Sequence, residues 1–189
     1  MAATIDRFLP HYDVRERFGR VVHAPAELTF EVAGQFEMES IPLVHAIVWM
    51  RGVLMGSKAP AAPHTGFFAM TTALGWGTLA RVEGRELVAG AVTQPWLADV
   101  KFTPVPAERF AAFDEPGLVK IVWTLETEPI DAGRCRLFTE TRALATDGTA
   151  RRLFLRYWRW VRFGSIPIRW LLIAAIRRAA ERRYARQPD

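Results

Sequence analysis

Charged side chains that alternate with threonine on two expected strands are the residues best suited to chemistry in this 189-residue chain. Glu126 shares one strand face with Thr124 and Glu128, and Glu140 shares one face of the following strand with Arg142. If these faces line an internal cavity, Glu126 or Glu140 could act as a general base, because burial shifts the pKa of a carboxyl group. The alternative, which we favour, is a set of cross-strand ion pairs on the outer face of the sheet.

Other reactive side chains indicate no particular reaction. The single cysteine, Cys135, lies between two arginines that could lower its pKa, yet a lone cysteine on a strand is usually inert. No two histidines stand four residues apart as helical metal ligands do, and no glycine-rich phosphate loop is present. We therefore expect neither a metal nor a cofactor, and we interpret His45, inside an apolar segment, as a core residue rather than a base.

Aromatic side chains form a second group of candidate site residues. Cavities for apolar ligands are lined mainly by aromatic and aliphatic side chains with a few polar groups. The same side chains could equally fill a solid core, so the sequence leaves both roles open. The candidates for ligand contact are Trp76, Trp96, Trp123, Arg142, Tyr157, Trp158 and Val161.

The C-terminal stretch 151–186 combines apolar residues at helical spacing with many arginines. Residues 151–189 carry a net charge of +9, whereas residues 1–150 carry −4. One stripe of the expected helix is apolar and another is basic, formed by Phe154, Trp158 and Val161 and by Arg152, Arg156 and Arg159 respectively. We expect no nucleic acid partner, because no other element carries a basic cluster. Weak contact with an anionic membrane stays open.

The elements that must position these residues follow the order strand, two helices, a run of strands and a long helix, which predicts an α+β fold. Asp147 is expected to cap the last helix, and the segment 164–167, which contains Pro167, is expected to bend it. On the first strand, Val14, Glu16 and Phe18 share a face. The expected helices are 26–36, 40–54, one or two turns within 106–113, and 148–186; the expected strands are 12–23, an irregular segment 67–80 around Gly75 and Gly77, 78–82, 86–93, 100–103, 118–128 and 134–145.

Four groups of residues carry a resemblance to a known family: 21–28, 110–123, 139–142 and 157–165. They resemble a bacterial branch of the START-like superfamily, also called SRPBCC or polyketide cyclase/dehydrase-like, over roughly residues 12–183. The resemblance implies a helix-grip fold, a curved antiparallel sheet of about six or seven strands around a long C-terminal helix, with two short helices after the first strand. It also implies one domain over residues 1–189 with flexible ends at 1–11 and 184–189.

The resemblance implies a range of functions, because members of the superfamily include lipid carriers, hormone receptors and cyclases. The leading interpretation is binding of a small hydrophobic molecule or lipid between the sheet and the terminal helix, which favours a binding protein over an enzyme. One alternative is a cyclase or dehydratase that uses a buried carboxylate, Glu126 or Glu140. Another is a peripheral membrane or partner-binding module that uses the basic helix. The lone cysteine and the lack of a long apolar run predict a cytoplasmic protein, and the sequence sets neither the ligand nor the oligomeric state.

Overall fold

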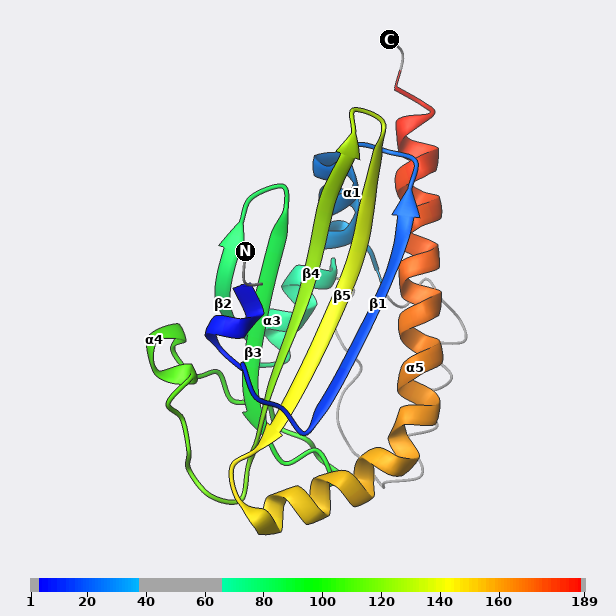
Figure 1. Cartoon of the computed structure of the whole chain (residues 1–189). Helices are drawn as coiled ribbons and strands as arrows, with labels where there is room; N and C mark the ends of the chain where they lie inside the picture. The colour runs from blue at the N-terminus through cyan, green and yellow to red at the C-terminus, as the bar shows by residue number, and fades with distance from the viewer. Residues whose placement is uncertain (1–3, 38–65, 188–189) are drawn as a thin grey trace.

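A five-stranded antiparallel sheet in the order β1-β5-β4-β3-β2 forms the centre of the protein, and a long C-terminal helix packs against it (Figure 1). The computed structural model describes residues 4–37 and 66–187. Its strands are β1 (Val14–Val22), β2 (Gly77–Val82), β3 (Glu86–Thr93), β4 (Val119–Asp131) and β5 (Arg134–Ala145), and its helices are η1 (Thr4–Arg7), α1 (Ala26–Gln35), α3 (Phe67–Ala73), α4 (Ala107–Phe110) and α5 (Gly148–Tyr184). The α+β, helix-grip arrangement expected from the sequence is confirmed.

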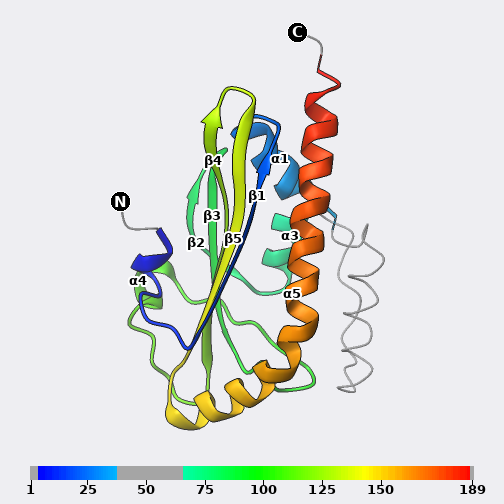
Figure 2. The same ribbon diagram turned by 45° about the vertical axis from the view of Figure 1, so that its right-hand side comes forward.

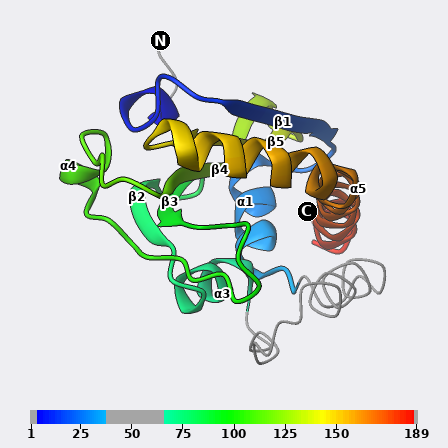
Figure 3. The same ribbon diagram turned by 90° about the horizontal axis from the view of Figure 1, so that it is seen from below.

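The sheet has apolar side chains on both faces, and it therefore separates two cores. On β3, Leu87 and Ala89 pack against α1 and α5 on what we call the inner face, while Val88 and Val92 pack on the outer face. Every residue of β3 is buried. Figure 3 looks along the strands and shows the sheet curving round α1, with η1 and α4 on the opposite side.

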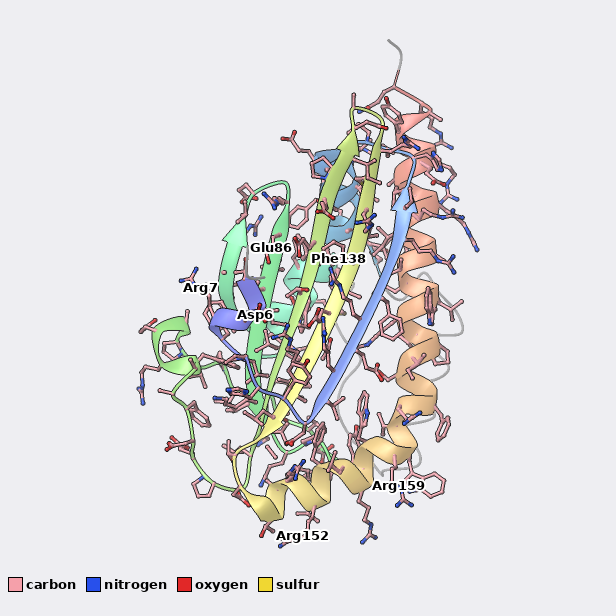
Figure 4. All side chains as sticks on the ribbon, in the orientation of Figure 1. Asp6, Arg7, Glu86, Phe138, Arg152 and Arg159 are labelled. Carbon is pink, nitrogen blue, oxygen red and sulfur yellow. The ribbon has the colours of Figure 1, made fainter. Side chains whose placement is uncertain are left out.

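Helix α5 begins at a capping aspartate and is bent. The Asp147 side chain accepts hydrogen bonds from the backbone N–H groups of Thr149 and Ala150, which confirms the expected N-cap. The first part of α5, with Arg152 and Arg159, runs beneath the sheet, and the rest rises beside β1 (Figures 2 and 4). Pro167 lies inside the helix, and a proline there removes one backbone hydrogen bond and favours such a bend. No helix in the described ranges is long and apolar enough to cross a membrane.

The sheet has fewer strands than the six or seven expected. The first part of segment 67–80 is helix α3, which ends before Gly75, where φ is +93°. The segment 100–103 makes only a single bridge, between Thr103 and Val92, and Pro104, which follows directly, has no N–H group to continue a ladder. The expected helix 40–54 lies outside the described residues.

The N-terminal segment that the structure describes packs against the outer face of the sheet. Ile5, Phe8 and Leu9 are at most 6% exposed and pack with Phe110 and Val122 in the outer core. Three apolar side chains within five residues stabilise η1 against the sheet, because each removes apolar surface from water. At the other end, α5 continues to Tyr184.

Candidate functional site

A cavity of about 420 Å³ lies between the inner face of the sheet and α5. Three walls line it: the inner-facing residues of β1, β4 and β5, one side of α5, and residues of α3 and of the loops that precede β2 and follow β3. The alternation of strand side chains decides which residues face it, so Ile121, Trp123 and Leu125 of β4 contribute while Val122 and Thr124 point to the outer face. The cavity is therefore a product of the sheet curvature and the α5 bend.

Five of the seven residues proposed for ligand contact line this cavity. They are Trp76, Trp123, Tyr157, Trp158 and Val161. Trp96 lies next to it and packs against the small core that contains Phe154. Arg142 does not face it, because the side chain leaves β5 on the outer face of the sheet.

Ring contacts hold the aromatic wall in place. Trp76 stacks on Phe102 with ring centroids 4.7 Å apart, and it meets Trp123 edge to face at 6.3 Å. The ring centroids of Phe67 and Trp123 lie 5.2 Å apart. Such contacts stabilise a pair of rings beyond the burial of their area. Phe67, which was not among the sequence candidates, and Phe102 both line the cavity.

Two charged side chains also line the cavity, and sequence reasoning missed both as site residues. Glu16 projects from β1 beside Thr141 of β5, and Arg169 projects from α5. Burial raises the pKa of Glu16, and the charges of Arg169 and Arg162 oppose that rise. Burial likewise lowers the pKa of Arg169, and the charge of Glu16 opposes it. A signal existed in the sequence, because Glu16 is a charged residue between the apolar Val14 and Phe18 on one strand face.

The candidate carboxylates Glu126 and Glu140 lie on the outer face, with Arg142, in a separate polar recess of about 330 Å³. Figure 4 shows this face, with Asp6, Glu86 and Phe138 on the side of the sheet away from α5. Neither candidate carboxylate lines the cavity. A general base for a ligand held in the cavity therefore cannot come from Glu126 or Glu140.

The outer recess contains a buried ion-pair network. Arg142 Nε donates to Glu140 Oε1 at 2.7 Å, Arg142 Nη1 donates to Asp6 Oδ1 at 2.7 Å, and Arg15 Nε donates to Glu140 Oε1 at 2.8 Å. Burial would raise the pKa of Glu140, but the two arginines outweigh it and hold that pKa below its ordinary value. Of these three contacts, the one between Arg15 and Glu140 joins two strands, β1 and β5, whereas Arg142 and Glu140 both lie on β5 and Asp6 lies in η1.

Glu126 differs from Glu140 in its surroundings. It pairs across the strands with Glu86, and burial together with that second carboxylate raises the pKa of Glu126. Glu86 in turn accepts a hydrogen bond from the Thr4 hydroxyl at 2.8 Å. This recess faces the N-terminal segment rather than a ligand cavity, so its charges hold η1 and the sheet together.

Cys135 and the histidines add no reactive centre to the described part of the chain. The Cys135 thiol is buried and donates to the Thr29 hydroxyl at 3.3 Å, and burial raises the pKa of the thiol rather than lowering it. In residues 4–37 and 66–187, no three His, Cys, Asp or Glu side chains converge as metal ligands would. His45 lies outside these residues.

Comparison with known proteins adds little about function. No family model and no curated protein matches the chain. Protein CV1439 from Chromobacterium violaceum is 14% identical and aligns over 86% of this chain and 96% of its own, with a TM-score of 0.36. The Zhui aromatase/cyclase from Streptomyces sp. R1128 is 14% identical and aligns over 90% of this chain and 94% of its own, with a TM-score of 0.33.

Proposed function

We propose that this protein binds a small apolar molecule in the cavity between the sheet and α5. The observation that supports the proposal is the cavity itself, about 420 Å³ with a mainly aromatic and aliphatic wall. Ligand sites of proteins fall in the range of about 300–1,000 Å³ and have such walls. An apolar ligand of fitting shape would gain roughly 25 cal/mol for each Å² of apolar surface removed from water.

Cavity-blocking variants test this function directly. Nile red, whose fluorescence rises in an apolar site, should bind the wild-type protein in a saturable manner. The double variant Ile121→Trp/Val161→Trp adds bulk from β4 and from α5, and we expect it to weaken Nile red binding at least tenfold. Val82→Trp adds the same side chain on β2, at a residue 47% exposed and outside the cavity, so it should bind as the wild type does.

Two results would contradict the proposal: no saturable binding to the wild type, or equal binding to the wild type and the blocked variant. Thermal unfolding of each variant shows whether a loss of binding reflects a loss of fold. Native mass spectrometry of the protein purified from cells would then give the mass of any molecule that remains bound.

A second candidate function is contact with an anionic membrane through α5. Trp160 and Phe163 are 71% and 70% exposed, although large aromatic side chains are usually buried. They lie three residues apart on one side of the helix, and the exposed Arg156, Arg159 and Arg162 surround them. Exposed aromatic rings among arginines are typical of helices that lie in the membrane interface.

Sedimentation with vesicles tests the membrane contact. The protein should sediment with phosphatidylglycerol-containing vesicles at 50 mM NaCl and should remain in the supernatant at 500 mM NaCl, because salt screens charge attraction. Trp160→Ala/Phe163→Ala should lower the bound fraction severalfold. Leu97→Ala, which removes an exposed apolar side chain outside α5, is the matched control. Equal sedimentation with neutral phosphatidylcholine vesicles, or none at low salt, would rule this function out.

A further inference from the structure

The cavity contains two buried polar atoms of opposite charge that lack hydrogen-bond partners. Glu16 Oε2, from β1, and Arg169 Nη1, from α5, are both buried and find no partner among the described residues. More than about nine in ten buried polar groups in native proteins are hydrogen-bonded, because an unpaired one loses its water without compensation. Both atoms therefore need a partner that the described part of the chain does not supply.

The two side chains reach the same part of the cavity. Glu16 and Phe18 are successive inner-facing residues of β1, and the Arg169 guanidinium carbon lies 5.7 Å from the centre of the Phe18 ring. Trp170, the next residue of α5, packs edge to face on the same ring at 5.4 Å. The contact between β1 and α5 thus fixes Arg169 close to Glu16, while Oε2 and Nη1 form no hydrogen bond with each other.

We propose that Glu16 and Arg169 bind a hydroxyl group of an otherwise apolar ligand, an alcohol or a phenol. One hydroxyl can satisfy both unpaired atoms, because its oxygen accepts from the guanidinium and its O–H donates to the carboxylate. The apolar part would contact the aromatic wall, including Trp123 and Trp158. This inference rests on the proposed function and adds the ligand class to it.

Charge balance favours a hydroxyl over the other head groups. A hydrocarbon would leave Glu16 Oε2 and Arg169 Nη1 buried and unpaired. A carboxylate could bind Arg169, but it would place a second negative charge beside Glu16 in a largely apolar cavity, where charges interact strongly. A neutral hydroxyl adds no charge and pairs with both groups.

Three ligands with one ring system separate these cases: 2-naphthol, naphthalene and 2-naphthoate, each titrated at pH 7 to displace Nile red. We expect 2-naphthol to bind at least tenfold more tightly than naphthalene, since hydrogen bonds to charged groups are the stronger class. We expect 2-naphthoate to bind more weakly than 2-naphthol.

Single variants test whether Arg169 and Glu16 cause the preference for 2-naphthol. Arg169→Met should reduce the preference for 2-naphthol over naphthalene to within about twofold. Glu16→Gln keeps the shape and removes the charge, so it should strengthen 2-naphthoate binding about tenfold while changing naphthalene binding little. Arg159→Met and Glu128→Gln, exposed on α5 and β4, are the matched controls and should leave all three affinities unchanged.

The outcomes separate the inference from the proposed function. If neither Nile red nor any naphthalene derivative binds, the proposed function fails. If Nile red binds and 2-naphthol shows no advantage over naphthalene, the cavity remains a binding site and the hydroxyl inference is overturned. Tighter binding of 2-naphthoate than of 2-naphthol also overturns it, in favour of an anion site.

If Arg169→Met unfolds, the isosteric Glu16→Gln decides, because unchanged 2-naphthoate affinity in that variant contradicts a role for Glu16.

Discussion

Arg142→Met should lower the free energy of unfolding at pH 7 by about 3 kcal/mol, the effect typical of removing one partner from a buried ion pair. Arg142 and Glu140 have side chains only 5% and 6% exposed. Arg142 also donates to Asp6 and to the Leu9 carbonyl oxygen at 2.9 Å, so its loss leaves three acceptors on the outer face without this donor. Glu140 keeps Arg15 as a partner, which places the effect at the lower end of the expected range.

The loss in Arg142→Met should depend on pH. The folded-state pKa of Glu140 lies below its ordinary value of about 4.3, so its ionised form stabilises the fold above that value, and this stability is lost as pH falls through the folded-state pKa. In the variant, less positive charge opposes the effect of burial, so the pKa of Glu140 is higher than in the wild type. The difference between wild type and variant should therefore be largest near pH 7 and should shrink as the pH falls through the higher pKa that Glu140 has in the variant, because protonation there removes the cost of the unpaired charge.

Urea denaturation at pH 7 and pH 4 measures both effects. Arg136→Met is the matched control, because Arg136 lies on the same strand in an exposed pair with Glu128 at 3.2 Å. An exposed pair is typically worth less than about 1 kcal/mol, so the control should lose little at either pH. A loss in Arg142→Met no larger than that in Arg136→Met, or one that does not change between the two pH values, would contradict this account.

Gly75→Ala should lower the free energy of unfolding by about 3 kcal/mol through two separate effects. The φ of Gly75 is +93°, a region that L side chains rarely adopt, and a Cβ atom at this position would lie 2.2 Å from the Phe102 carbonyl oxygen. Because that contact is with backbone, relief requires movement of the chain around Phe102. Trp76 stacks on the Phe102 ring, so the movement should also disturb the cavity wall.

Gly117→Ala measures the cost of the backbone conformation without a steric clash. Gly117 has a φ of +83°, but a Cβ atom there would meet only the Gln94 side chain at 3.9 Å. Gly117→Ala should therefore lower the free energy of unfolding by about 1 kcal/mol, from the backbone conformation alone. We expect Gly75→Ala to weaken Nile red binding and Gly117→Ala to leave it unchanged. Equal losses of stability in the two variants would show that the approach of Gly75 to Phe102 has no energetic consequence.

The mainly apolar cavity and the charged outer recess lie on opposite faces of one sheet. Glu16 and Arg15 are neighbours in sequence, yet Glu16 faces the cavity and Arg15 binds Glu140 on the opposite face. Strand alternation sends successive side chains to opposite faces. A substitution in the ion-pair network should thus act on stability, whereas one in the cavity should act on binding.

Several local elements were predictable because short stretches of sequence encode them. The expected strands 78–82 and 86–93 are present as β2 and β3, and Asp147 caps α5 with its own side chain. The α3 helix was not predicted, because Phe67–Ala73 reads as an apolar strand and its helical form depends on packing of Phe68 against Phe30 and Gly34. Tertiary contacts override weak local preferences of this kind.

The fold class, the strand faces on β4 and β5, and the aromatic residues that could line a ligand site can be derived from the sequence, because side-chain period and capping are local properties. In contrast, the folded arrangement is needed to see that Glu126, Glu140 and Arg142 face away from the cavity and that Glu16 and Arg169 face into it. Which side of a sheet becomes the inner side depends on where a helix packs. That choice is made by contacts between residues such as Phe18 and Trp170, which lie 152 positions apart in the chain.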